Sequence, residues 1–176
     1  FENQQRASQR LKVIVPISGL LIFSLLFWAF RSVNKAALVL VMVPFTLIGG
    51  IAGLALAGMH LSISAAVGFI AVAGISVQNG VIMVEQFMEY MRDGKGLAEA
   101  VLEGAVSRLR PIVMTSLAFI LGVVPLIISH GAGAEMRKSL GTAVFSGMLG
   151  VTLFGVVLTP VFFYTIDSLG RSKCKR

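Results

Sequence analysis

Five long apolar runs divide the chain, and each is long enough to cross a membrane as an α-helix. A bilayer core about 30 Å thick needs about 20 helical residues. No stretch alternates apolar and polar residues with period two, and a lone lipid-facing strand would leave its backbone groups unpaired. The pattern therefore predicts an all-α membrane protein whose spans cover residues 13–30, 36–57, 62–88, 111–129 and 139–166.

A shorter amphipathic segment separates the third span from the fourth. Its apolar residues recur at helical spacing: Leu97, Val101, Leu102, Ala105 and Leu109. Pro111 then opens the fourth span, at a position where the missing N–H costs little. The pattern predicts a short helix over residues 96–109 that lies at the membrane surface.

Composition agrees with a polytopic membrane protein. The chain is 56% hydrophobic and 13% charged, whereas soluble domains are about 45–50% apolar and about 25% charged. The net charge of +7 comes from basic residues at the ends of the apolar runs. We interpret them as topology signals and expect no nucleic-acid partner. The single cysteine, Cys174, lies in a basic tail and is interpreted as an incidental thiol.

The distribution of lysine and arginine predicts the orientation. With the N-terminus outside, the inner loops and tail hold ten of these residues and the outer segments hold five. Because inner loops carry the excess of positive charge, we expect an outer N-terminus and an inner C-terminus. The chain begins at Phe1 and its first dozen residues do not form a signal peptide, so we expect a piece of a longer polypeptide.

Two adjacent amides, Gln78 and Asn79, lie near the middle of the third span. An unpaired amide in hydrocarbon costs several kcal/mol, so both must face protein or water. They either form hydrogen bonds between helices, worth about 0.6–2 kcal/mol, or they line an ion pathway. The residues alone leave both readings open.

A second polar row follows the fourth span. Arg108, Thr115, Gly122 and Ser129 are seven residues apart and stack on one side of a helix, with Ser116 beside Thr115. Arg108 is either part of a polar pathway or a membrane-surface anchor. No acidic residue lies near the centre of a span, so a proton-carrying carboxylate is not expected in this chain.

No metal site or cofactor is predicted. His60 and His130 are separate loop residues without partners at ligand spacing. Met83 and Met114 carry soft thioethers that can bind Cu(I), but packing is the favoured interpretation. The chain has no phosphate-binding loop of the type G-x-x-x-x-G-K-[ST], so nucleotide hydrolysis is not expected.

Five stretches together resemble one family. They are FENQQRASQRLKVIVP, VPFTLIGGIAGLAL, HLSISAAVGFIAVAGISVQNGVIMVEQ, RLRPIVMTSLAFILGVVPLIISHGAGAEMRKSLGTAV and LTPVFF. The chain resembles the C-terminal transmembrane half of resistance–nodulation–division (RND) efflux permeases of the heavy-metal and multidrug types. The resemblance implies a secondary active transporter, not an enzyme, that exports its substrate by proton antiport across the Gram-negative inner membrane.

The resemblance also implies an architecture and partners. The permeases have twelve helices in two similar halves and large periplasmic domains. They form homotrimers that join a periplasmic adaptor and an outer-membrane channel. This chain would supply helices eight to twelve, packed in lipid against the missing N-terminal half. Residues 1–12 would end a periplasmic domain, residues 13–166 would form the helix bundle, and residues 167–176 would form a basic cytoplasmic tail.

Site residues follow from the same resemblance. In multidrug permeases a lysine on helix ten, and an arginine and a threonine around helix eleven, surround proton-carrying aspartates of helix four. The matching residues here are Gln78, Arg108 and Thr115, and Gln78 departs from the lysine. Gln78 and Asn79 would then hydrogen-bond to the carboxylates of the missing half and to water. With Ser116, the neighbour of Thr115, the candidate proton pathway comprises Gln78, Asn79, Arg108, Thr115 and Ser116.

The substrate class is a choice between two branches. Residues 1–80 look like heavy-metal exporters and residues 108–164 look more like multidrug exporters. We expect heavy-metal cations, with a multidrug permease as the alternative. A non-transporting scaffold or sterol-sensing relative of this fold, or a remnant of a transporter, is a further alternative.

Overall fold

The computed structural model describes residues 2–60 and 62–173, and side chains of residues 9–45, 47–60 and 62–168. This part of the chain forms five helices joined by short turns: α1 Glu2–Phe30, α2 Val33–Leu56, α3 Ile63–Arg92, α4 Leu97–Ile127 and α5 Ala134–Lys173. Each contains a window long and apolar enough to cross a membrane. The predicted all-α architecture with five spans is confirmed.

Helix boundaries differ most from the prediction in α1, α4 and α5. Residues 2–12 and 167–173 are helical, so α1 and α5 extend beyond the apolar runs that predicted them. Residues 97–109 are helical as predicted, but they do not form a separate surface helix: they are the first turns of α4, which continues through Pro111. Cys174 lies outside the described residues.

The continuity of α4 has a packing reason. Its buried residues keep one face on both sides of the proline: Ala100, Val101, Gly104, Ile112 and Ser116. Proline removes one backbone hydrogen bond but its fixed φ is compatible with a helix. The predicted amphipathic face is only partly covered, because Leu102 and Leu109 remain exposed. The amphipathic pattern therefore marks the end of a span and not an independent element.

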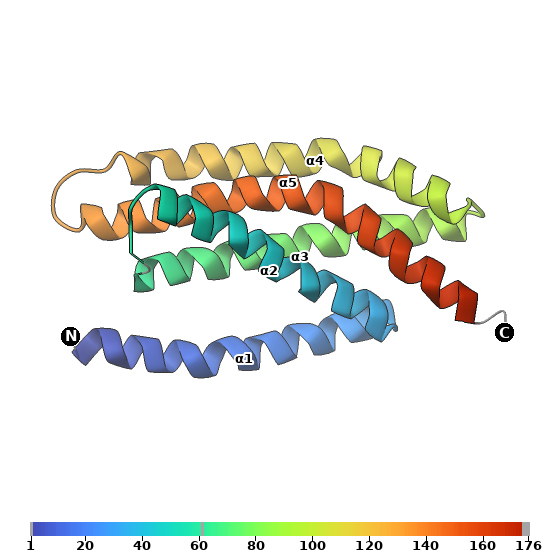
Figure 1. Ribbon diagram of the computed structural model, residues 1–176, viewed down its shortest axis with the longest axis horizontal. Coiled ribbons are helices and arrows are strands. Elements are labelled where there is room, and N and C mark those ends of the chain that lie inside the picture. Colours follow the sequence, from blue (N-terminus) through green and yellow to red (C-terminus); the bar gives the residue numbers. More distant parts are fainter. Residues whose placement is uncertain (1, 61, 174–176) are drawn as a thin grey trace.

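Helix α5 is the centre of the bundle. It packs against α2, α3 and α4, while α1 lies at the edge and meets α2 and, less extensively, α3 (Figure 1). The α1–α2 turn and the α3–α4 turn lie at the same end of the molecule as the C-terminal end of α5 (Figure 1). Gly94 has φ of +88°, a conformation that glycine adopts without strain. Side chains on α3 and α4 near this end are therefore brought together.

Small residues let α2 and α5 approach at the distance of backbone contact. A Cβ atom added at Gly49 would lie 2.8 Å from the Cα of Gly150, and one added at Gly53 would collide with Ser146. Ser146 Oγ donates to Gly50 O across the contact at 3.3 Å. The small-residue face of α5 is thus the surface that receives α2, which is how helices associate in lipid.

Candidate functional site

The two central amides lie on different sides of α3. Gln78 is exposed, on a stripe that includes Ile70, Gly74 and Glu85, whereas Asn79 is half-buried and faces the other helices. Neighbouring residues of a helix are about 100° apart, so one amide turns outward when the other turns inward. The pair therefore does not act as a single polar patch.

Asn79 faces a small cavity of about 10 Å³ between α2, α3, α4 and α5. Ser76 and Thr159 are its other polar lining residues, and both are buried. Its apolar lining residues are Met42, Met83, Ile112 and Val151, with Gly80 and Gly155. Asn79 Nδ2 is buried there without a hydrogen-bond partner within the described chain. This volume is close to the smallest that holds one water molecule.

Arg108 binds a residue that the sequence reasoning did not single out. Its Nε donates to Gln86 Oε1 at 2.8 Å, and Gln86 Nε2 donates to Glu89 Oε2 at 3.0 Å. Gln86 lies on α3, seven residues after Asn79, so the two share nearly the same side of the helix. The spacing of seven between Asn79 and Gln86 can be recognised in the sequence, whereas the contact between Gln86 and Arg108 of α4 cannot.

Thr115 and Ser116 also separate. Thr115 is exposed and its Oγ1 donates to the backbone carbonyl of Ile112 at 2.9 Å. Ser116 is only 1% exposed, and its Oγ has no partner in the described part of the chain. Of the predicted row at spacing seven, Arg108, Thr115 and Gly122 lie on α4, whereas Ser129 lies beyond its last residue, Ile127. The Thr115 and Ser129 hydroxyls donate to nearby backbone carbonyls, and Arg108 donates to α3.

The five candidate residues thus fall into three places. Gln78 and Thr115 are exposed, Asn79 and Ser116 point into the bundle, and Arg108 connects α4 to α3. No hydrogen bond joins any two of the five within residues 2–60 and 62–173. Over the same residues, no three His, Cys, Asp or Glu side chains gather as a metal site would require. The site is a set of polar positions around α3 and α4.

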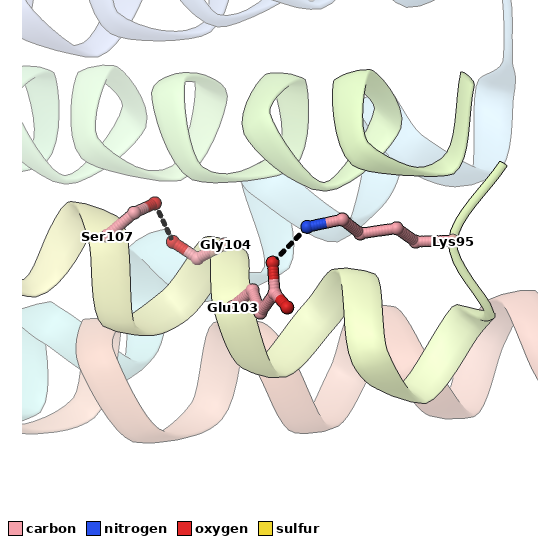
Figure 2. A network of polar contacts seen from close by, with 4 residues as sticks. All are labelled: Lys95, Glu103, Gly104 and Ser107. Carbon is pink, nitrogen blue, oxygen red and sulfur yellow. Dashed lines mark hydrogen bonds and ion pairs between the residues drawn. The ribbon is translucent and has the colours of Figure 1, made fainter. Parts of the chain in front are cut away.

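A second polar contact lies at the turn between α3 and α4. Lys95 forms an ion pair with Glu103, and Ser107 Oγ donates to Gly104 O at 2.9 Å (Figure 2). The ammonium of Lys95 also lies 4.5 Å from the centre of the Tyr90 ring. The hydrogen bond with Glu103 raises the pKa of Lys95 above its usual value. This end of the α3–α4 pair is therefore held by polar side chains.

Comparison with known proteins gives consistent matches. A profile of the AcrB/AcrD/AcrF family matches residues 1–167. The chain is 43% identical over 163 residues to the cobalt-zinc-cadmium resistance protein CzcA of Cupriavidus metallidurans. It is 37% identical over 164 residues to the multidrug resistance protein MdtF of Escherichia coli. Each alignment covers 93% of this chain, but only 15% of CzcA and 16% of MdtF.

The fold is similar to that of a solved structure. The crystal structure of a heavy metal efflux pump superposes with a TM-score of 0.85 and 40% identity. The superposition covers 96% of this chain and 17% of that pump. The five helices therefore match a small part of a much longer protein.

Proposed function

This chain belongs to the AcrB/AcrD/AcrF family of RND permeases, and we propose that it forms helices eight to twelve of a proton-driven exporter of heavy-metal cations. The observation that carries the substrate class is the identity of 43% to a cobalt-zinc-cadmium resistance protein, against 37% to a multidrug resistance protein over the same share of the chain. The multidrug permease is the second candidate, supported by that 37%.

The geometry supports a role in proton coupling. Gln78 and Thr115 are exposed polar groups on spans, where lipid contact would be unfavourable. They fit a surface that packs against another part of the transporter. The described spans have no acidic residue near their centres, so we propose that the titrating carboxylates belong to the missing N-terminal half. In this proposal Gln78 and Thr115 contact the carboxylates directly. Asn79, Arg108 and Ser116 lie further inside the bundle and contribute to the polar environment of the pathway.

Orientation and partners belong to the same proposal. The excess of lysine and arginine at the end that carries the C-terminus supports a cytoplasmic C-terminus and a periplasmic N-terminus. A place in the inner membrane, a homotrimer, a periplasmic adaptor and an outer-membrane channel are inferred from family membership. The function is then secondary active transport.

Metal susceptibility tests the substrate class. The complete transporter that contains this chain is produced in a strain lacking its own metal and drug exporters, and growth is measured with cobalt, zinc or cadmium and with a panel of drugs. We expect higher tolerance of a metal and unchanged tolerance of drugs. The opposite result assigns the protein to multidrug export, and no change with either supports a non-transporting scaffold or remnant.

Substitutions in the same strain test the pathway. Gln78→Leu is expected to lower metal efflux without lowering the amount of protein, because it removes a polar group from an exposed face. Wild-type efflux in that variant would leave only a packing role for Gln78.

Arg108→Ala is expected to impair efflux more than Arg110→Ala, because Arg108 bonds to α3 whereas Arg110 is exposed. The readout is the initial rate of metal uptake into inverted membrane vesicles, normalised to the amount of transporter. Equal rates in the two variants would reduce Arg108 to a membrane-surface anchor.

A further inference from the structure

The side chain of Gln86 connects two charged groups that lie on different helices. Its Oε1 accepts from the Arg108 guanidinium of α4 at 2.8 Å, and its Nε2 donates to the Glu89 carboxylate of α3 at 3.0 Å. Gln86 and Arg108 are both half-buried, whereas Glu89 is exposed. A short polar chain therefore runs from the exposed side of α3 to the contact between α3 and α4.

The chemistry at the two ends fixes the orientation of the Gln86 amide. A guanidinium only donates hydrogen bonds and an ionised carboxylate only accepts them. Rotating the amide by 180° would place its N–H₂ against Arg108 and its oxygen against Glu89, which breaks both bonds. Glu89 thus keeps Gln86 Oε1 turned towards Arg108, and it does so from an exposed position where it carries no packing.

Arg108 has an alternative that this contact prevents. Arginine side chains near the ends of spans extend towards water, which leaves the guanidinium away from the helix interior. Arg110 shows that alternative two residues later: it is exposed and has no hydrogen-bond partner in the described chain. The difference between the two arginines is the acceptor that α3 presents to Arg108.

We propose that Gln86 is a positioning residue that holds Arg108 against α3, and that Arg108 contributes to transport only when it is held there. Glu89 assists by orienting the amide. The inference rests on the proposed function, because it assigns to Gln86 an effect on the transport step in which Arg108 takes part. It also gives a physical basis for the unequal roles expected of Arg108 and Arg110.

The test compares variants of the complete transporter in inverted membrane vesicles, with zinc, cobalt and cadmium each supplied alone. Gln86→Leu replaces the amide by an apolar side chain of similar volume that offers no acceptor, and we expect the maximal transport rate to fall about tenfold. Gln86→Glu retains an acceptor oxygen for Arg108 but loses the donor to Glu89, so we expect a rate within about threefold of the wild type and well above that of Gln86→Leu. The metal concentration at half-maximal rate should be unchanged in both.

Two further variants serve as controls. Glu103→Gln removes the ion pair with Lys95 at the same end of α4 and leaves the partners of Arg108 intact, so its transport rate should equal that of the wild type. Glu89→Ala alters an exposed residue that does not support folding, and we expect a fall of about twofold to threefold as the amide loses its orientation. The second variant keeps the test informative if Gln86→Leu does not reach the membrane.

A double variant shows whether Gln86 acts through Arg108. If it does, Gln86→Leu combined with Arg108→Ala transports at the same rate as Arg108→Ala alone; independent effects would multiply. A multiplied loss, a wild-type rate in Gln86→Leu, or a Gln86→Glu variant as slow as Gln86→Leu would each overturn the inference.

The proposed function fails in a different way: the wild-type transporter itself would then accumulate none of the three metals in these vesicles. A wild-type rate in Arg108→Ala would remove Arg108 from transport and would overturn the inference with it. A slow Arg108→Ala beside a normal Gln86→Leu would overturn the positioning role alone.

Discussion

The contact between α2 and α5 and the contact between α3 and α4 join neighbouring helices by different means. In the first, Gly49 faces Gly150 so closely that a Cβ would lie 2.8 Å from a backbone carbon. In the second, the connection near the α3–α4 turn is made by side chains, with Arg108 bonded to Gln86 and the Phe87 ring seated on Gly104. The α2–α5 contact is therefore made mainly by backbone atoms, and the α3–α4 contact is made by side chains that can change rotamer.

The difference separates a fixed part of the bundle from an adjustable one. Helices in lipid are held by close packing and by hydrogen bonds, because burying apolar surface there gives no advantage over lipid. Backbone contacts have no alternative arrangement at similar energy. A hydrogen bond such as that of Arg108 can be exchanged for another by a rotamer change. We therefore expect α2 and α5 to move as one body and α3 and α4 to change their contact during transport.

The largest effect is expected from breaking the backbone contact. Gly49→Ala should lower the free energy of unfolding by about 3 kcal/mol, because the added methyl meets backbone atoms that only a shift of the helix can move. Denaturation of the purified transporter with increasing detergent measures it. Gly155→Ala is the control within α5: nothing lies within 4 Å of its Cβ, so stability should be unchanged or slightly higher. Equal losses in both would contradict the comparison.

A smaller loss is expected from the matching change between α3 and α4. A Cβ at Gly104 would lie 2.5 Å from Cδ1 of Phe87, a ring that is fully buried and packs on Phe163 at 5.1 Å. Gly104→Ala should cost about 1–2 kcal/mol, since the ring can turn but has little room. The same unfolding measurement applies. A loss larger than that of Gly49→Ala would mean that the side-chain contact is the more rigid one.

Buried serines extend the comparison to hydrogen bonding. Ser116 Oγ on α4 has no partner within the described residues, whereas Ser139 Oγ on α5 lies 2.8 Å from Ser62 Oγ. Removing an unpaired hydroxyl should raise the free energy of unfolding, and removing a paired one should lower it, each by about 1 kcal/mol. Ser116→Ala and Ser139→Ala delete the same atom, so opposite signs are the expected result. If Ser116→Ala is more stable but transports metal more slowly, the unpaired hydroxyl of Ser116 lowers stability and serves transport.

The smallest effect concerns the exposed ion pair at the α3–α4 turn. Glu103 raises the pKa of Lys95 above its usual 10.5. The pair therefore stabilises the folded state fully below pH 10.5, and this contribution is lost as the pH rises through the raised pKa. Glu103→Gln should lower stability slightly at neutral pH, because exposed pairs contribute little. The difference from the wild type should vanish in unfolding measurements at higher pH.

Hydrophobic pattern alone predicted the architecture because lipid requires each span to satisfy its own backbone. Each of the five apolar runs corresponds to one of the five helices. The pattern was less informative at the beginning of α4. A polar–apolar alternation of period 3.6 describes both a surface helix and the exposed end of a span. In the structure, Ala100 and Gly104 are buried on the same helix as Ile112, so this segment is the beginning of the span and not a separate surface helix.

Apolar length and matching residues are enough to predict a helical chain with spans long enough to cross a membrane, and to place it in a family of transporters. The sequence also placed Gln78 and Asn79 in the middle of a span. The folded bundle was needed to see that Gln78 is exposed, that Asn79 faces a cavity and that Gln86 accepts a hydrogen bond from Arg108. The reason is physical: local spacing fixes which residues share a helix face, but the partner of that face comes from helices distant in the sequence.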